Sequence, residues 1–312
     1  MTKILITGGA GFIGSALAEK LLQNPDNFIV IVDNLISGDV RKLPIARSER
    51  LRFIKCDVNY LNDISEVMTS FPFDYVFHYA AMVGVQRTQN NPVKVLHDLK
   101  GIENVLNLSK NSGVKRVFFS SSSEVYGEPT ELPQNEQTTP LNSRIPYAVV
   151  KNAGEAFLKS YKKEFDLDYT IFRFFNTYGP KQSVDFVMSR FILLAMRNQD
   201  ITIYGDGMQT RTFCFIDDNV DACLKAFYTD QYINDVVNIG GSKEITVVKL
   251  AKKVIKLTKS KSNIVFVPAL EEGDMLRRFP DVTKMMALLE REPVSLEDGI
   301  EKILENPEFI IR

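Results

Sequence analysis

Residues that form metal sites and disulfide frameworks are scarce in this 312-residue chain. Its three cysteines, Cys56, Cys214 and Cys223, lack the paired spacing of a zinc site, and an odd number of cysteines is poor evidence for disulfides. With only His78 and His97 besides, a zinc site would have to be assembled from carboxylates. We therefore expect no bound metal.

A surplus of either charge is also missing. The chain has 38 lysines and arginines against 39 aspartates and glutamates, a net charge of −1. Nucleic-acid binding needs a basic surplus on some face, so we expect no nucleic-acid partner, although a local basic patch is compatible with this balance. No apolar run approaches the roughly 18 residues of a membrane helix, so we expect no membrane partner. The opening residues, MTKILITGGAGFIG, enter patterned sequence directly, so we expect no signal peptide and a cytoplasmic location.

What the chain does contain is an alternation of short apolar runs and longer helical patterns. The runs predict strands at Lys3–Thr7, Phe28–Val32, Arg52–Cys56, Asp74–His78, Lys115–Phe119 and Asp168–Phe174. Their hydrophobicity is continuous, which indicates burial on both faces, as in a parallel sheet covered by helices. Helices are predicted near residues 12–23, 62–69, 91–111 and 147–165. This alternation predicts an α/β fold with a doubly wound parallel sheet of the Rossmann type.

The pattern changes after about residue 175. Fewer buried strands and more Gly, Pro and charged turns indicate a smaller C-terminal lobe. We expect helices near 184–197, after Asp217-Asp218, near 246–257 and twice in the tail, with strands at Ile201–Tyr204, Thr210–Phe215, Val236–Ile239 and Ile264–Val267. The predicted domains are residues 1–174, with about 213–240 packing back onto them, and residues 175–312.

A glycine-rich loop follows the first predicted strand. Gly8, Gly9, Gly11 and Gly14 give two overlapping spacings that let the backbone approach a pyrophosphate at the start of a helix. The alternative is a simple tight turn. Asp33, at the end of the second strand and 19 residues after Gly14, is near the separation at which an acid meets the adenosine ribose. A carboxylate there repels a 2′-phosphate, and the nearest downstream basic residue is Arg41, so NAD is favoured over NADP.

Two further positions face the same edge of the predicted sheet. Asp57-Val58, after the third strand, would lie beside the adenine, although a helix-capping aspartate is an equally good interpretation. Ala80-Ala81, after the fourth strand, would leave room for a cofactor that crosses the sheet. The preceding His78 is better interpreted as a packed core residue than as a catalytic one.

Tyr147-x-x-x-Lys151 places two side chains on one face of a predicted helix. Such a pair is uninformative alone, but Ser122 follows the fifth strand and would lie at the same carboxyl edge. A free tyrosine has a pKa of about 10. An ammonium at about 4 Å, with an effective dielectric near 20, would lower it by about three units, toward a value useful for acid–base catalysis at neutral pH. Tyr147 would then take the proton of a sugar hydroxyl that Ser122 holds.

The motifs of this chain, in their order, resemble the extended short-chain dehydrogenase/reductase family. The strings are TGGAGFIG, Asp33-Asn34, His78-Tyr79-Ala80-Ala81, SSSSEVYG, Tyr147-x-x-x-Lys151 and RFFNTYGP, and the match runs from residue 2 to about 300. More narrowly, they are similar to nucleotide-sugar epimerases, dehydratases and decarboxylases. The resemblance implies a tightly held NAD that oxidises C4 of the sugar, with Ser122, Tyr147 and Lys151 in the catalytic positions. A non-catalytic dinucleotide sensor is the alternative, but such proteins tend to lose the tyrosine and the lysine.

The resemblance also implies the other site residues and makes the C-terminal lobe the nucleotide-sugar site. Phe174 would face the nicotinamide, and Asn176 the nucleotide diphosphate. Arg211 and Arg277 would grip that diphosphate, a task suited to the arginine fork. Either arginine could form a surface ion pair instead, and Arg278 could replace Arg277. Further expected cofactor contacts are Gly8, Gly11, Phe12, Ile13, Gly14, Asn34, Ser37, Gly38, Tyr79, Ala80 and Ala81, together with the catalytic Tyr147 and Lys151. Further substrate contacts are Ser123, Glu124, Val187 and Tyr204, the last two beside a base that the sequence does not identify.

The residues after Ser122 bear on which reaction follows oxidation. A 4,6-dehydratase usually has an Asp-Glu pair where this chain has Ser123-Glu124, and a serine hydroxyl is far too weak an acid for that role. Glu124 keeps a base available, and Ser-Glu resembles the UDP-glucuronate decarboxylases. Among chains of this layout 4-epimerisation is the commonest outcome, and we expect it here, in surface-polysaccharide sugar biosynthesis. A net 4-dehydrogenase that releases the keto sugar, or a decarboxylase, is the alternative.

Two expectations concern the helices near 91–111 and 147–165. The first carries Asp98 where the family usually has asparagine, and this acid could alter cofactor contacts or pair with Lys100. In the family, two such helices from each subunit form a four-helix interface, so we expect a homodimer. Apolar positions that it would bury are Val105, Leu108, Phe157 and Tyr161, although these could equally face their own sheet.

Overall fold

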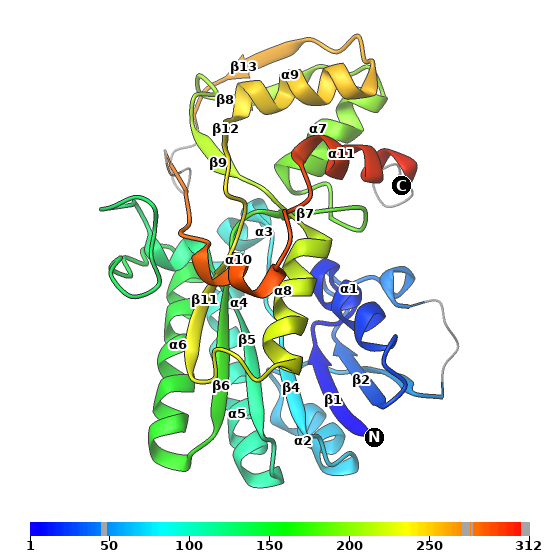
Figure 1. Ribbon diagram of the computed structural model, residues 1–312, viewed down its shortest axis with the longest axis vertical. Coiled ribbons are helices and arrows are strands. Elements are labelled where there is room, and N and C mark those ends of the chain that lie inside the picture. The colour runs from blue at the N-terminus through cyan, green and yellow to red at the C-terminus, as the bar shows by residue number, and fades with distance from the viewer. Residues whose placement is uncertain (45–48, 270–274, 276, 307–312) are drawn as a thin grey trace. The chain divides into compact units, whose positions relative to one another are not determined.

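Seven strands of the chain form one sheet. The computed structural model describes residues 1–44, 49–269, 275 and 277–306. The strand order is β11-β6-β5-β4-β1-β2-β3 (Figure 1), and β1 pairs in parallel with β2 and β4, as do β2 with β3 and β4 with β5. The order reverses beside β1, which is the switch point at which such sheets bind ligands. The strands are β1 (Thr2–Thr7), β2 (Asn27–Asp33), β3 (Leu51–Lys55), β4 (Tyr75–His78), β5 (Arg116–Ser122), β6 (Asp168–Phe174) and β11 (Asp235–Ile239).

Helices cover both faces of this sheet. On one face, Val30 and Val117 share a core with Ile102 and Leu158 from two of the helices. On the other face, the rings of Phe77 and Phe118 stack with centroids 4.4 Å apart, and Phe227 meets both edge-on. The helices of the first face are α2 (Leu61–Ser70), α5 (Asp98–Ser112) and α6 (Pro146–Phe165), and those of the second are α1 (Phe12–Leu21) and α8 (Ile216–Tyr228).

The doubly wound α/β class predicted from the sequence is confirmed. The prediction depended on continuous apolar runs, and every residue of Ile4–Ile6 and Ile29–Val32 is fully buried. Burial of successive residues, whose side chains point to opposite faces, requires cover on both faces. Among the described residues, no helix has the length and apolarity needed to cross a bilayer.

The helix predicted over residues 91–111 is two helices. It is divided at His97 into α4 (Pro92–Leu96) and α5. The N–H of Lys100 donates to the carbonyl of His97 over 2.9 Å, a three-residue spacing that tightens the chain at the junction. Asp98 therefore lies in the first turn of a new helix, where a negative charge is favourable.

The chain divides into two compact units, each made of three stretches of sequence. Unit 1 comprises Met1–Val125, Ser143–Arg173 and Val220–Val237, and unit 2 comprises Tyr126–Asn142, Phe174–Asn219 and the chain from Asn238 onward. Unit 2 contains three pairs of strands, of which β7–β10 and β8–β13 are parallel and β9–β12 is antiparallel. Its strands are β7 (Thr177–Tyr178), β8 (Ile201–Tyr204), β9 (Thr210–Thr212), β10 (Cys214–Phe215), β12 (Glu244–Thr246) and β13 (Ile264–Val267), and its helices are α7 (Val187–Met196), α9 (Val247–Thr258), α10 (Thr283–Leu289) and α11 (Leu296–Glu305).

Candidate active site

The glycine loop of unit 1 leaves no room for side chains at two positions. Gly8 has a φ of 68°, and a Cβ on it would lie 2.7 Å from the backbone of Ala80. A Cβ on Gly14 would lie 2.6 Å from the carbonyl oxygen of Gly8. Helix α1 begins at Phe12 after Gly11, which has no side chain to cap it, so its N-terminal amides can serve an anion. The predicted dinucleotide cradle fits this geometry.

His78 ties the glycine loop to the neighbouring strand. Thr7 Oγ1 lies 2.8 Å from His78 Nδ1 and accepts the main-chain N–H of Ala80 at 3.1 Å. His78 is 3% exposed, stacks on Phe119, and has its pKa lowered to about 3 by burial, aided by the charge of Lys151. It is therefore a neutral, packed residue that holds Ala80 against Gly8.

Asp33 is held by main-chain donors at the end of β2. Its two carboxylate oxygens accept the N–H of Leu35 at 2.8 Å and that of Ala10 at 3.1 Å. A Cβ on Gly38 would lie 2.5 Å from this carboxylate, so Gly38 allows the loop to close over it. Burial raises the pKa of Asp33, and the two main-chain donors and the charge of Lys42 oppose that rise.

The basic residue beside Asp33 is not the one that the sequence indicated. Arg41 is bound to Asp39 through both Nε and Nη2. Lys42 is 8% exposed, and its charge acts on Asp33. Burial lowers the pKa of Lys42. Sequence reasoning missed Lys42 because distance along the chain does not reveal which of two adjacent side chains turns inward.

A chain of hydrogen bonds runs along the carboxyl edge of the sheet from β2 to α5. The Asn34 amide donates to Asp57 at 3.0 Å, and Asp57 accepts the main-chain N–H of Asn59 at 3.0 Å. The Asn59 amide donates to Asp98 at 3.3 Å, and the N–H of Met82 donates to the other oxygen of Asp98 at 2.7 Å. Two predicted cofactor residues, Asn34 and Asp57, are thereby connected to the unusual Asp98.

The environment of Asp98 bears on whether this acid interacts with Lys100, as the sequence allowed, or with another cation. Burial raises its pKa, while the bonds from Met82 and Asn59 and the charge of Lys151 lower it. Reciprocally, Asp98 raises the pKa of Lys151. A cation that acts on Asp98 is therefore Lys151 of α6.

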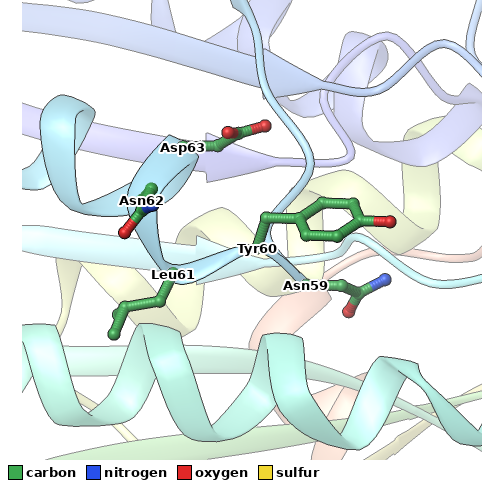
Figure 2. Close-up of a pocket in the computed structure, with 5 residues that line it drawn as sticks. All are labelled: Asn59, Tyr60, Leu61, Asn62 and Asp63. Carbon is green, nitrogen blue, oxygen red and sulfur yellow. The ribbon is translucent and has the colours of Figure 1, made fainter.

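A surface pocket of about 380 Å³ lies at the N-terminal turn of α2, lined by Asn59, Tyr60, Leu61, Asn62 and Asp63. Figure 2 shows the side chains of Tyr60 and Asp63 on one side of this turn and that of Leu61 on the other. Asp63 accepts the main-chain N–H of Asp57 at 3.4 Å. The pocket thus adjoins Asp57-Val58, where the sequence predicts the adenine.

Lys151 is buried beside the predicted catalytic residues. Its Nζ donates to the carbonyl of Ser120 at 2.6 Å and lies 5.8 Å from the ring centroid of Tyr147 and 5.0 Å from that of Phe119. Only 3% of Lys151 is exposed, and burial lowers its pKa to about 8. At pH 7 roughly nine-tenths of Lys151 is therefore charged. The carbonyl of Ser120, which the sequence did not single out, fixes its position.

The serine run, Ser120–Ser123, begins in β5 and continues into the turn that follows it. Ser122, the last residue of the strand, accepts the main-chain N–H of Glu124 on its Oγ at 3.2 Å. Ser123 is 2% exposed and opens the 3-10 turn Ser123–Tyr126. Ser122, Tyr147 and Lys151 all belong to unit 1, and Glu124 lies two residues beyond Ser122 in the same unit.

The other predicted cofactor residues of unit 1 occupy the same strand ends. Phe12 and Ile13 form the first turn of α1, and Ser37 is exposed in the loop after β2. Tyr79 and Ala81 are partly buried directly after β4. Burial also raises the pKa of Tyr79 well above its usual value.

The predicted diphosphate-binding arginines lie in unit 2. Arg211 is 8% exposed, and its Nη1 donates to the carbonyl of Thr210 at 2.7 Å. Half-exposed Arg277 forms a two-bond ion pair with Glu244, Nε to Oε1 at 2.8 Å and Nη2 to Oε2 at 2.5 Å. Arg278 is 7% exposed, and its Nε donates to the sulfur of Met275 at 3.3 Å. Of the alternatives that the sequence left open, Arg277 has the ion pair, and Glu244 is the partner that the sequence did not indicate.

The remaining predicted substrate residues are also in unit 2. Asn176 has a φ of 28° between β6 and β7, and its amide donates to the carbonyl of Thr212 at 3.1 Å. Val187 begins α7 and Tyr204 ends β8, and both are partly exposed, as is Phe174, the predicted nicotinamide contact at the end of β6. The roles of these residues in substrate binding stay predictions.

Comparisons with known proteins agree along nearly the whole chain. A model of the NAD dependent epimerase/dehydratase family matches residues 4–240. UDP-glucuronic acid decarboxylase 6 of Arabidopsis thaliana is 34% identical over 307 residues, 96% of this chain and 86% of that protein. Among solved structures, UDP-glucose 4-epimerase of Thermotoga maritima with UDP-glucose has a TM-score of 0.91 at 32% identity and covers 98% of this chain and 99% of its own. UDP-glucuronic acid 4-epimerase of Bacillus cereus, in complex with UDP-glucuronic acid and NAD, has a TM-score of 0.88 at 30% identity and covers 99% of both chains.

Proposed function

The chain belongs to the NAD-dependent epimerase/dehydratase family, and from this membership we propose that it is a 4-epimerase of UDP-sugars. The membership confirms the resemblance drawn from the motifs, and with it NAD as the cofactor and nucleotide-sugar chemistry as the class of activity. UDP is the nucleotide bound by two similar epimerases in their solved structures. Oxidation of the sugar at C4 and the step that follows it are the proposed part.

The similar solved epimerases favour 4-epimerisation, and the observation that carries the shared first step, oxidation at C4, is the position of Lys151. A buried ammonium fixed by the carbonyl of Ser120 stands one helical turn from Tyr147, in the same unit as Ser122. Such a charge favours the phenolate of Tyr147 and makes it a base near neutral pH. Burying a charged group costs free energy, and a lysine with a purely structural role would not require burial beside a partly buried tyrosine.

In the proposed reaction, the Tyr147 phenolate accepts the proton of the C4 hydroxyl. Ser122 orients that hydroxyl, and because its Oγ accepts the N–H of Glu124, its own proton is directed elsewhere, toward the sugar oxygen. Bound NAD supplies the acceptor for the hydrogen of C4. Once the 4-keto sugar has turned over, Tyr147 returns the proton as C4 is reduced on its other face.

Decarboxylation of a UDP-glucuronic acid is the second candidate. It is favoured by Ser123-Glu124, which keeps a carboxylate two residues from Ser122, and by the 34% identity to an Arabidopsis decarboxylase. Both reactions begin with the same oxidation of C4. They differ in whether the sugar carries a carboxylate that can leave as CO2.

A product analysis separates the two candidates. We would incubate the purified chain with NAD and UDP-glucose, UDP-galactose or UDP-glucuronic acid and analyse the products by mass spectrometry and NMR. Epimerisation leaves the mass unchanged and inverts C4, and we expect this result. Loss of CO2 would assign the decarboxylase, and loss of two hydrogens with NADH accumulation would assign a net 4-dehydrogenase. Either result would overturn the epimerase proposal.

We also propose that the chain forms a homodimer, but the residues that support this proposal differ from those that the sequence indicated. Val105 and Tyr161 are buried in the core of unit 1, and Leu108 and Phe157 pack against it, so these positions do not require a partner. Exposed apolar side chains lie instead on α4 and α6, where Val93 is 67%, Leu96 40% and Val149 40% exposed.

Light scattering at micromolar concentration tests this proposal. We expect a dimer for the parent chain and a monomer for the double variant Val93→Lys/Val149→Lys. Val265→Lys, on a 40% exposed valine of unit 2, is the matched control and should stay dimeric. A monomeric parent would contradict the proposal.

A further inference from the structure

A buried ion pair lies one helical turn beyond the proposed catalytic lysine. Glu155 of α6 and Arg173 of β6 are each 1% exposed. Arg173 donates from Nε to Oε1 of Glu155 at 2.9 Å and from Nη2 to Oε2 at 2.7 Å. Oε1 also accepts the hydroxyl of Ser121 at 2.6 Å. The cluster Ser121–Glu155–Arg173 therefore joins β5, α6 and β6.

Stability alone is a weak explanation for such a pair. Both charges lose their hydration on burial, and well-packed apolar residues at such positions are often as stable or more so. What a bidentate pair provides is a fixed geometry, because the planar fork accepts a carboxylate in few orientations. The question is which geometry the pair fixes.

Three positions of α6 meet three successive residues of β5. Lys151 donates to the carbonyl of Ser120, and Glu155 accepts the hydroxyl of Ser121. Between them, a Cβ on Gly154 would run into the ring of Phe119, so the helix lies unusually close to the strand here. Tyr147, Lys151 and Glu155 are spaced by four residues and share one helical face.

We propose that the cluster Ser121–Glu155–Arg173 is a positioning device that holds the Tyr147–Lys151 face of α6 in register with the Ser122 end of β5. Its three members touch neither sugar nor cofactor in the proposed reaction. They act through the separation between the ammonium of Lys151 and the phenol of Tyr147. The inference rests on the proposed role of Tyr147 as the acid–base.

The pKa of Tyr147 depends on the distance between its phenol and the ammonium of Lys151, so it can be used to measure a change in that distance. With an effective dielectric near 20, lengthening it from about 4 Å to about 6 Å raises the phenol pKa by about one unit. Asp98 of α5 also acts on Lys151, and the charge of Lys151 in turn lowers the pKa of His78 of β4. Lys159 of α6 lies 4.0 Å from Glu155. A test must leave these three residues unchanged and conserve net charge.

The double variant Glu155→Met/Arg173→Met meets both conditions. The measurement is tyrosinate absorbance against pH for the full-length, cofactor-free chain, with the same variant carrying Tyr147→Phe as the blank. We expect the Tyr147 titration to move up by about one pH unit, and the first turnover with a UDP-sugar at pH 7 to slow about fivefold. A folded double variant with the parental titration would overturn the inference.

Two milder variants serve if the double variant does not fold. Ser121→Ala removes one bond to Glu155, and Glu155→Asp shortens its reach by one methylene, so both should move the titration up by less than the double variant. Parental titrations in both would overturn the inference.

Asp230→Asn is the matched control, because Asp230 pairs with Arg116 at 3.0 Å at the opposite end of β5. This variant should leave the Tyr147 titration unchanged. If it shifts the titration as much as the double variant does, the shift reflects a general loosening of the fold, and the inference is overturned. A parental Tyr147 that ionises near pH 10 would overturn the acid–base assignment together with the inference. A low parental pKa that the double variant does not move would overturn the inference alone.

Discussion

Three charged groups of the candidate site in unit 1 and the predicted diphosphate-binding Arg277 of unit 2 are held in different ways. In unit 1, Lys151 donates to the carbonyl of Ser120, and Asp33 and Asp98 accept main-chain N–H groups. In unit 2, Arg277 is bound by both ends of its fork to Glu244. A charged group that is held by main-chain dipoles is not neutralised, so its charge can act on a bound ligand. A charged group in an ion pair must first separate from its partner before it can bind a ligand. Changes in unit 1 should therefore have the larger effects.

Tyr147→Phe should have the largest effect of all. It keeps the ring but removes the ionisable oxygen, so C4 oxidation should slow by roughly 10³-fold, the range of general acid–base catalysis. Stopped-flow reduction of bound NAD by a UDP-sugar measures this rate, and UDP binding should be nearly unchanged. A near-parental rate would remove Tyr147 as the base and make Glu124 the next candidate.

Lys151→Met should act through pH. The parent has a charged Lys151 below about pH 8. Without that charge the Tyr147 phenolate is less stable, so the pH at which the rate rises should move up by about three units. The profile must be measured at saturating NAD, because Lys151 is also a predicted cofactor contact. An unmoved profile would show that Lys151 does not support the phenolate.

Asp33→Ala should weaken NAD binding by roughly 10- to 100-fold, since hydrogen bonds to a charged group are lost. It should weaken NADP binding much less, because the repulsion of a 2′-phosphate disappears as well. Calorimetric titrations with both cofactors measure the two changes, with Asp39→Ala as the control for a nearby acid. Tight NADP binding by the parent would contradict the assignment.

Asp98→Asn replaces the acid by the residue usual in the family. Asp98 raises the pKa of Lys151, so its removal should make Lys151 lose its proton at a lower pH than in the parent. A fall of about half a unit from that pKa halves the charged fraction of Lys151 at pH 8, and the rate there should fall about twofold. Lys100→Met is the control and should leave the pH profile unchanged. An unchanged profile for Asp98→Asn would separate Asp98 from Lys151.

Glu244→Gln tests the paired charge of unit 2 and should have an effect about as small as that of Asp98→Asn. It frees Arg277, and because a half-exposed ion pair contributes little, UDP should bind only about two- to fivefold more tightly. Arg277→Ala should weaken UDP binding, and calorimetry measures both variants. If neither variant changes UDP affinity, Arg277 does not bind the diphosphate, and Arg278 becomes the candidate.

Much of the fold could be predicted because the determining patterns are local. Continuous apolar runs predicted β13 and β8 at their observed bounds, Ile264–Val267 and Ile201–Tyr204. Their parallel pairing with each other was not predictable, because more than fifty residues separate them and neither run carries a signal for its partner. The division of the 91–111 helix at His97 was missed because it depends on a change of hydrogen-bond spacing that periodicity does not reveal.

In the candidate site, too, the local features could be predicted from the sequence and the distant partners could not. The Gly8–Gly14 loop and the Tyr147–Lys151 spacing are each contained in a few residues, so the sequence was sufficient to indicate them. The partners that set their chemistry are distant in sequence, as with Glu244 for Arg277 and Asp98 for Lys151. Whether a charge is free or paired therefore had to come from the structure.

The interleaving of the two units limits how relatives of this chain can exchange parts. Unit 1 and unit 2 each consist of three alternating stretches of sequence. A single recombination crossover therefore cannot transfer one unit intact onto the other unit of a relative. Under the proposal that unit 2 binds the nucleotide sugar, a new sugar specificity should be easier to reach by point substitutions within the stretches of unit 2 than by gene fusion. Libraries that vary these stretches while keeping Ser122, Tyr147 and Lys151 would explore specificity without rebuilding the catalytic centre.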